Sequence, residues 1–409
     1  MPRSFSALLE SSIVPRISKS SWKFSRVSRS QTVVAGILIV ATTTLGAPAA
    51  SALGLSSGSS SLIGSSSVLG DAQHAVNEAQ IAQILEKYNI PGAQVVHQKG
   101  SVTDSYAVGV ARKDLGTPVS ENTMFQAASL TKVVSTYAFL KLVDEGKLDL
   151  DTPLWDYYQS PRIAGSAEAK TITARMVLNH TTGLPNWATS PGAEDSALVP
   201  QWTPGSKFGY SGDAFFLLQQ VVEHMENKNF ADILDTEVFR PFNMEHSSLV
   251  FREADIPLMT VGHNENGEPG KLSEFRQGND AYTLLTSADD YTKFIQRAII
   301  SGEGLSPEVH QKWLQDSSDA NQTPPSPADP FISWGLGIGL ETSDLGPAVW
   351  HWGDNGSRRA FFIAFPERKE SVAMFWNSSN GQKSAEDLLQ LFLGKGDFHS
   401  TEWVNGNPE

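Results

Sequence analysis

Cysteine is absent from this chain of 409 residues. Its absence excludes disulfide bonds, zinc sites built on thiolates and a cysteine nucleophile. Histidine is scarce as well, with nine scattered residues and no His-Glu-x-x-His pattern or other metal-ligand spacing. No glycine-rich phosphate loop follows a predicted strand. We therefore expect no metal ion and no cofactor, so that any catalysis must come from ordinary side chains.

Positive charge is also in short supply, with 31 Lys and Arg against 45 Asp and Glu and a formal net charge of −14. So acidic a chain is a poor partner for nucleic acid or for an anionic membrane surface. The hydrophobic content of 40% with 9% aromatic side chains is typical of a globular protein. The length allows one large core or two lobes.

The N-terminal segment predicts export. Residues 1–31 carry six basic side chains against one acid, and the apolar run 33–40 and the small residues Ala50-Ser51-Ala52 follow. This series is typical of a secretory signal peptide, here residues 1–52, with a long basic region. An uncleaved membrane anchor is the alternative, although the apolar run is short for a membrane span. We expect a secreted or cell-envelope protein with no stable membrane association after cleavage.

Glycine and serine dominate residues 53–72, which predicts a flexible linker. The linker contains Gly54-Leu55-Ser56-Ser57-Gly58, a formal match to the nucleophile elbow of α/β-hydrolases. That motif requires a strand before it and a helix after it, whereas both flanks here are of low complexity. We interpret the match as chance.

A serine and a lysine stand three residues apart where a strongly apolar helix is predicted to begin. Ser129 and Lys132 precede the apolar stretch 133–143, and Gly146 provides a stop signal. The two side chains share one helix face, and the free N–H groups at a helix start favour negative charge developing on Ser129. Burial and the helix dipole disfavour the charged form of Lys132, which makes its amine a better proton acceptor. The pair is a candidate activated nucleophile, although a helix cap followed by a solvent-reaching lysine gives the same pattern.

Two further motifs follow in order along the chain. Tyr210-Ser211-Gly212 lies in a loop before a predicted helix, and His351-Trp352-Gly353 ends a predicted strand. With the Ser-x-x-Lys pair, this order resembles the serine hydrolases related to class C β-lactamases, D-alanyl-D-alanine carboxypeptidases and their esterase relatives. Residues 148–153 and 178–185 are also similar to that family. The resemblance covers about residues 75 to 395.

The resemblance implies that the chain forms an acyl-enzyme. Ser129 would attack a carbonyl carbon, and Lys132, Tyr210 or both in one network would accept the hydroxyl proton; the residues leave this choice open. The backbone N–H groups of Ser129 and Asp354 would form the oxyanion hole. The site residues that the resemblance implies are Ser129, Lys132 and Tyr210 for catalysis, and His351, Trp352, Gly353 and Asp354 for substrate and oxyanion binding.

The chain departs from the family pattern at two positions. Gly212 stands where relatives that act on β-lactams or peptides usually have an asparagine that holds the substrate amide. Trp352 stands where relatives often have a hydroxyl that binds the substrate carboxylate, and Arg358 and Arg359 are candidates to replace it. These losses weaken recognition of β-lactams and D-Ala-D-Ala peptides, while an indole beside the cleft suits an apolar group.

We therefore expect a monomeric, esterase-like serine hydrolase that acts on small esters, amides or peptides. One alternative is a D,D-carboxypeptidase or β-lactamase that acts on peptidoglycan peptides or β-lactams. Another is a catalytically weak penicillin-binding or sensor protein, which the loss of the amide-holding asparagine at Gly212 keeps open.

Predicted strands lie at both ends of the folded region, with helices between them. The predicted strands are 93–98, 101–110, 348–352, 360–365 and 371–376. The predicted helices besides the nucleophile helix are 76–88, 173–179, 213–227, 287–300 and 384–393. This order predicts an α+β fold in which N- and C-terminal strands form one antiparallel sheet, with an inserted helical lobe. We assign one hydrolase domain to 73–395 and a polar tail to 396–409.

Overall fold

The computed structural model describes residues 61–406 and the side chains of residues 70–406. The predicted signal peptide 1–52 and the elbow-like segment 54–58 lie outside the described residues. The first helix, α1 (Ser61–Lys87), begins inside the stretch that the sequence predicts as linker. No proline interrupts this stretch, and Ile81 and Leu85 near its C-terminal end are buried, so that the helix is anchored there.

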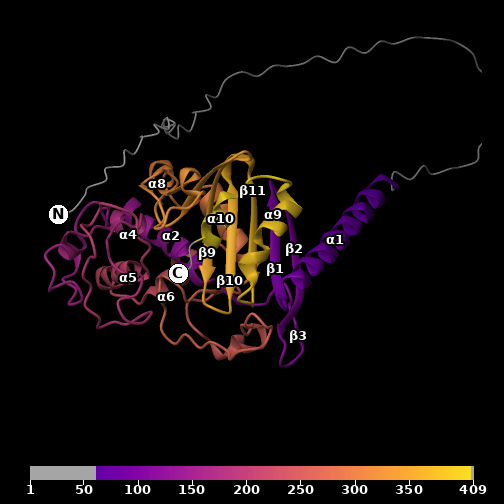
Figure 1. The fold of residues 1–409 in the computed structure, drawn as a ribbon, viewed down its shortest axis with the longest axis horizontal. Helices are drawn as coiled ribbons and strands as arrows, with labels where there is room; N and C mark the ends of the chain where they lie inside the picture. Colours follow the sequence, from indigo (N-terminus) through magenta and orange to yellow (C-terminus); the bar gives the residue numbers. More distant parts are fainter. Residues whose placement is uncertain (1–60, 407–409) are drawn as a thin grey trace, which may run out of the picture. The chain divides into compact units, whose positions relative to one another are not determined.

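Nine strands form one sheet in the order β3-β2-β1-β11-β10-β9-β8-β7-β6, and each neighbouring pair is antiparallel (Figure 1). The strands are β1 (Gly92–Lys99), β2 (Val102–Arg112), β3 (Thr117–Pro118), β6 (Ser318–Asp319), β7 (Ile332–Trp334), β8 (Gly339–Ser343), β9 (Gly346–Asp354), β10 (Arg359–Phe365) and β11 (Glu370–Trp376). A separate pair joins β4 (Phe125–Gln126) to β5 (Leu285–Thr286). The pairing of β1 with β11 brings the two ends of the domain together, so the predicted fold class is confirmed.

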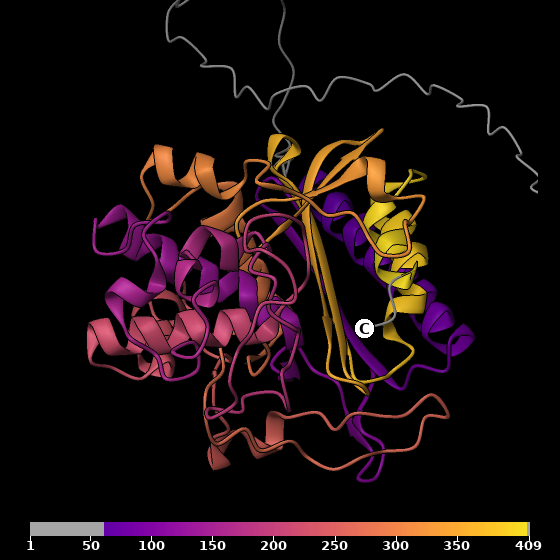
Figure 2. The same ribbon diagram turned by 60° about the vertical axis from the view of Figure 1, so that its left-hand side comes forward.

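The helices cover both faces of the sheet. The helices after α1 are α2 (Thr131–Asp144), α3 (Leu154–Tyr157), α4 (Ala174–Leu178), α5 (Gly212–Glu226), α6 (Phe230–Leu234), α7 (Ala288–Phe294), α8 (Pro307–Trp313), α9 (Ala385–Leu393) and α10 (His399–Gly406). Short 3-10 turns are η1 (Ala128–Leu130), η2 (Ala169–Thr171), η4 (Glu253–Leu258), η6 (Asp329–Phe331), η7 (Pro366–Arg368) and η8 (Gly381–Ser384), and π turns are η3 (Asp235–Phe239) and η5 (Ile295–Ile300). Figure 2 shows α1, α9 and α10 on one face of the sheet and the inserted helical lobe on the other.

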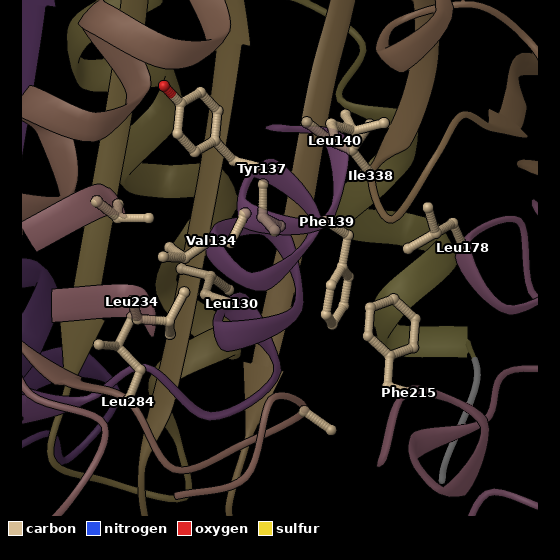
Figure 3. Close-up of a cluster of buried hydrophobic side chains, with 14 of the residues drawn as sticks. Leu130, Val134, Tyr137, Phe139, Leu140, Leu178, Phe215, Leu234, Leu284 and Ile338 are labelled. Atoms are coloured by element: carbon tan, nitrogen blue, oxygen red, sulfur yellow. The ribbon is translucent and has the colours of Figure 1, made fainter. Parts of the chain in front are cut away.

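The nucleophile helix α2 runs through the core of the lobe, as its apolar sequence predicts. Figure 3 shows Leu130, Val134, Tyr137 and Phe139 surrounded by apolar side chains from neighbouring elements. All four are buried, as is most of α2. The first residues of this helix are therefore held by packing on every side, which fixes where Ser129 and its neighbours point.

The C-terminal segment is not the polar tail that the sequence predicts for 396–409. Residues His399–Gly406 form α10, which packs on β7 and β8. Trp403 is fully buried and donates its indole N–H to the carbonyl of Ala320 at 3.0 Å. The prediction was wrong because one tryptophan in a polar octapeptide shows no helical periodicity, and its burial depends on a distant part of the chain.

Within residues 61–406, no helix combines the length and the apolar character that crossing a membrane requires.

Candidate active site

The nucleophile turn is fixed by hydrogen bonds to a distant loop. Ser129 lies in η1, immediately before α2. The backbone N–H of Ala127 donates to the carbonyl of Leu284 at 2.8 Å. In return, the N–H of Leu284 donates to Oγ1 of Thr131 at 3.1 Å. The turn therefore presents Ser129 from a rigid support.

Lys132 contacts both of the other predicted catalytic residues. Its Nζ atom donates to Oγ of Ser129 at 3.1 Å and to the carbonyl oxygen of Ala281 at 3.0 Å. It also lies 4.7 Å from the ring centroid of Tyr210, where the ring face attracts a cation. The lysine is only 1% exposed. The structure thus brings Ser129, Lys132 and Tyr210 together, as the sequence predicts.

Tyr210 is held between two other rings. The ring of His180 lies 4.3 Å from it and that of Trp352 lies 4.8 Å from it, centroid to centroid. His180 also accepts the N–H of Ser211 on Nδ1 at 3.2 Å, which places its own proton on Nε2. Burial lowers the pKa of His180 well below its usual value, and the charge of Lys132 acts in the same direction. His180 is therefore a neutral ring that supports the loop of Tyr210. The sequence did not predict this role.

His351 is buried beside this cluster. Its Nδ1 lies 2.7 Å from the carbonyl oxygen of Trp352, so that the proton on Nδ1 donates to that carbonyl. Burial, helped by the charge of Lys132, lowers the pKa of His351 to about 3. The imidazole is therefore neutral at ordinary pH. It does not line the cavity that contains Ser129 and Lys132, described below. The part in substrate binding that the resemblance implies for His351 stays a prediction.

Trp352 lies elsewhere than the sequence suggests. Its indole is 4% exposed and packs against Trp403, with ring centroids 5.3 Å apart. Successive side chains of a strand point to opposite faces, and Trp352 shares with Trp350 the core that faces α9 and α10. The indole is therefore part of that core and does not line the catalytic cavity.

Gly353 and Asp354 complete the third motif next to the nucleophile. A Cβ atom on Gly353 would lie 2.3 Å from the carbonyl oxygen of Ala127, so only glycine fits there. Ala128, in the same contact, has a φ of +47°, a strained value for a residue other than glycine. The carboxylate of Asp354 pairs with Arg359 and accepts the N–H of Gly356 at 2.7 Å. Asp354 lines one cavity with Ser129, and the oxyanion role of their N–H groups stays a prediction.

The catalytic cavity has a volume of about 340 Å3. Its lining residues are Gln126, Ser129, Lys132, Asn186, Trp187, Pro191, Ser273, Phe275, Tyr282, Asp354, Asn355 and Arg358. The ring of Tyr282 stands edge-on to Trp187 on one side and to Phe275 on the other, each at 5.5 Å between centroids. One part of the cavity lining is thus aromatic.

The loop of Trp187 occupies the place beside Gly212. The N–H of Gly212 donates to Oδ1 of Asn186 at 2.9 Å. A Cβ atom on Gly212 would lie 2.3 Å from Cζ2 of Trp187. The space that an asparagine side chain would need at position 212 is therefore filled by an indole.

Arg358 brings a cation into the cavity. It donates from Nη2 to the carbonyl of Lys271 at 2.7 Å, and burial lowers the pKa of its guanidinium. Within residues 61–406, no carboxylate forms an ion pair with Arg358, whereas Arg359 is paired with Asp354. Of the two arginines considered from the sequence, only Arg358 lines the cavity.

One buried acid near the nucleophile was not foreseen. Asp280 is fully buried next to Ala281, whose carbonyl accepts the Lys132 hydrogen bond. Burial raises the pKa of Asp280 well above its usual value, and the charge of Lys132 opposes that rise. In the described part of the chain, no group of three or more His, Asp or Glu side chains is placed to hold a metal ion.

Comparison with known proteins relates this chain to a family. The model of the Beta-lactamase family matches residues 77–393. Penicillin-binding protein 4 of Amycolatopsis lactamdurans is 23% identical over 345 residues, which cover 79% of this chain and 90% of that protein.

Two solved structures share the fold. The D-alanine carboxypeptidase of Burkholderia cenocepacia superposes with a TM-score of 0.67 at 18% identity, over 80% of this chain and 99% of that chain. A class C β-lactamase gives a TM-score of 0.67 at 19% identity, over 78% of this chain and 95% of that chain. At these identities, the structural likeness establishes the fold alone.

Proposed function

Because the chain belongs to the β-lactamase family of serine hydrolases, we propose that it hydrolyses small esters or amides through an acyl-enzyme on Ser129. The observation that carries the proposal is the distance of 3.1 Å between Nζ of Lys132 and Oγ of Ser129 in a buried site. A serine beside an amine that can take its proton is an activated nucleophile.

The reaction divides into two acyl transfers. With Lys132 as the neutral amine, Oγ of Ser129 attacks the carbonyl carbon, its proton passes to Nζ, and the carbonyl oxygen takes the negative charge in front of the Ser129 and Asp354 N–H groups. As the tetrahedral intermediate collapses, the bond to the leaving group breaks and Lys132 returns the proton to it. Water then attacks the acyl-enzyme in the same way and releases Ser129. The hydroxyl of Tyr210 accepts the Ser129 proton in place of Lys132 or shares it with Lys132, whose Nζ lies 4.7 Å from the centroid of the tyrosine ring.

Preference for esters is proposed from what surrounds the cavity. Trp187 fills the space beside Gly212, so that no side chain at position 212 can hold a substrate amide. The aromatic wall of Trp187, Phe275 and Tyr282 suits an apolar acyl or alcohol group. An ester also needs less protonation of its leaving group than an amide does.

One observation favours a second candidate function. Arg358 offers a guanidinium to the cavity without a carboxylate partner among residues 61–406. A substrate carboxylate would supply that partner, as in the penicillins and in peptides ending in D-alanine. A D,D-carboxypeptidase or β-lactamase therefore stays the second candidate.

The test compares three probes on one preparation. A fluorophosphonate, a fluorescent penicillin and a panel of p-nitrophenyl esters are each incubated with the protein, and intact mass and turnover are recorded. We expect labelling at Ser129 and turnover of esters that exceeds that of penicillin. Peptide mapping that places the adduct on Ser56 would contradict the nucleophile assignment. Faster hydrolysis of penicillin or of a D-Ala-D-Ala peptide would favour the second candidate.

We also propose that the mature protein is an exported monomer that begins near Leu53. The basic, apolar and small-residue series of residues 1–52 supports the proposal. N-terminal sequencing of exported material and light scattering test the two parts. A chain that retains residues before Val33 would instead be anchored.

A further inference from the structure

A second cavity opens beside the catalytic one. Its volume is about 1080 Å3, and three residues, Pro191, Phe275 and Tyr282, line both cavities. The rings of Phe275 and Tyr282 meet edge-to-face with centroids 5.5 Å apart. A substrate bound at Ser129 therefore has to pass only this aromatic rim to reach the second cavity.

Acids predominate among the charged groups of the second cavity. The titratable side chains that line it, tyrosines aside, are Glu194, Glu223, Asp232, Glu274, Arg276 and His224. The guanidinium of Arg276 is paired with Glu274 at 2.7 Å. Within residues 61–406, no cation forms an ion pair with Glu194 or Glu223. Glu194 and Glu223 therefore line the cavity without an ion-pair partner in the described part of the chain.

Glu223 is the acid held most firmly in this cavity. One of its oxygens, Oε1, accepts the N–H of Phe230 at 2.8 Å and the side-chain amide of Gln219 at 3.1 Å. These bonds fix the carboxyl group on α5. Burial raises the pKa of Glu223, and the nearby charge of Glu194 raises it further. A cation brought in by a ligand would relieve both effects.

Two uncharged groups at the cavity also lack partners. Asn279 is 4% exposed and its Oδ1 accepts the N–H of Ala281 at 2.9 Å. Its Nδ2, like Oε1 of Gln220, has no hydrogen-bond partner among the described residues. Both residues line the cavity. A buried donor and a buried acceptor left unpaired are costly, and amide or hydroxyl groups of a ligand are the kind that can satisfy them.

We propose that the second cavity binds a substrate arm that carries a cationic amine beside amide or hydroxyl groups, while Ser129 attacks the carbonyl at the other end. An aminoacyl or short peptide chain has this chemistry. The inference rests on the proposed function for its use in catalysis, because it needs Ser129 as the nucleophile. The binding itself can be measured without turnover.

Two p-nitrophenyl esters of equal shape provide the test. The 6-(trimethylammonio)hexanoate ester carries a positive charge where the 7,7-dimethyloctanoate ester carries a carbon atom. We expect the Glu194→Gln/Glu223→Gln variant to lower the ratio of kcat/KM between the cationic and the neutral ester by about three- to tenfold, mainly through KM. Turnover of p-nitrophenyl acetate, which is too short to reach the cavity, should stay unchanged.

Glu78→Gln/Glu86→Gln is the matched control, because it removes two charges from exposed positions of α1. It should leave the ratio unchanged, which separates the cavity from the general acidity of the protein. An equal ratio in wild type and in the Glu194→Gln/Glu223→Gln variant would overturn the proposal. So would an equal fall of the ratio in the control variant.

Binding to the Ser129→Ala variant separates this proposal from the proposed function. Methyl 6-(trimethylammonio)hexanoate is titrated into that variant by calorimetry, with and without the two Glu→Gln changes. Binding that the changes weaken supports the second cavity even if no ester is hydrolysed. If short esters are hydrolysed but the changes leave binding unaltered, the proposed function stands and the cavity proposal fails.

Discussion

The indole of Trp187 occupies the position that any side chain on Gly212 would take. Cζ2 of Trp187 lies 2.3 Å, and Cη2 2.4 Å, from where a Cβ atom on Gly212 would be. Glycine at 212 and tryptophan at 187 therefore depend on each other. Where relatives usually have an asparagine side chain, this chain has the indole of Trp187, which is part of the aromatic lining of the cavity.

We predict that Gly212→Asn alone destabilises the protein by about 1–3 kcal/mol, the usual cost of overpacking. In a Trp187→Ala background the same change should cost much less, because the space is then open. Thermal unfolding of the four proteins in this cycle measures the coupling. The double variant should also hydrolyse penicillin faster relative to short esters than Trp187→Ala does.

Trp202→Ala provides the control for this cycle. Trp202 packs in the same way against Gly209 but does not contact Gly212. Gly212→Asn should remain costly in that background. Equal costs in all three backgrounds would show that Trp187 moves aside freely and does not define the site.

The approach of Gly353 to the nucleophile turn gives a second prediction. Gly353→Ala would place a methyl group 2.3 Å from the carbonyl oxygen of Ala127, so β9 must move away from Ser129. We expect a loss of about 1–3 kcal/mol in stability and a fall of about 100-fold in ester turnover, as for a misplaced catalytic group. Gly165→Ala, where no atom lies within 4 Å of the new Cβ, should change neither. Full turnover by Gly353→Ala would show that this contact does not hold Ser129 in its reactive position.

The sequence predicts well those parts of the fold that repeat locally. Strands near 93–98, 348–352 and 371–376 were visible as apolar runs, and β1, β9 and β11 cover them. By contrast, β7 and α10 are short and mixed in polarity, so no local sequence pattern predicts them. Their burial comes from the neighbouring strands and from contacts such as that of Trp403 with Ala320.

The site residues, too, could be predicted only where local sequence spacing sets their positions. Ser129 and Lys132 could be paired from spacing alone, because three residues on a helix set their distance. Trp187 and Arg358 reach the cavity from loops far apart in sequence, so their place depends on the tertiary fold. Trp352 was misplaced because the substrate-binding place of the family's hydroxyl residue was carried over to it, whereas its indole packs into the core with Trp350.

Removal of either proton-handling side chain should slow the reaction strongly. We predict that Lys132→Ala and Tyr210→Phe each lower kcat/KM for a short ester by about 100- to 10,000-fold. The double variant should be little worse than the poorer single one, because both groups are proposed to handle the same proton of Ser129. Lys170→Ala, which loses only a contact with Trp155, is the control. Near-normal turnover in a folded single variant would exclude that residue from the mechanism.

The pH dependence of stability should report on Glu341, which joins β8 to α10. Its carboxyl group is 1% exposed and accepts the N–H groups of His399 at 2.8 Å and Ser400 at 3.2 Å. Burial outweighs these bonds and raises the pKa of Glu341 to about 7. The folded protein therefore keeps this proton to a higher pH than the unfolded chain does. The stability that the group contributes is complete at acid pH and is lost as the pH rises from about 4.5 to 7.

Glu341→Gln isolates this contribution, because its amide stays neutral and still offers one oxygen to α10. We predict that the variant gains stability relative to wild type as the pH rises from about 4.5 to 7, by up to about 3 kcal/mol at 1.36 kcal/mol per pKa unit. Urea unfolding at several pH values measures the difference, in which the titration of all other groups cancels. Glu402→Gln, an exposed change on the same helix, should show no such trend. The opposite result is that the stability of wild type rises relative to that of Glu341→Gln as the pH increases. It would show that the hydrogen bonds of the carboxylate to α10 outweigh the cost of its burial, so that α10 packs more firmly when Glu341 is ionised.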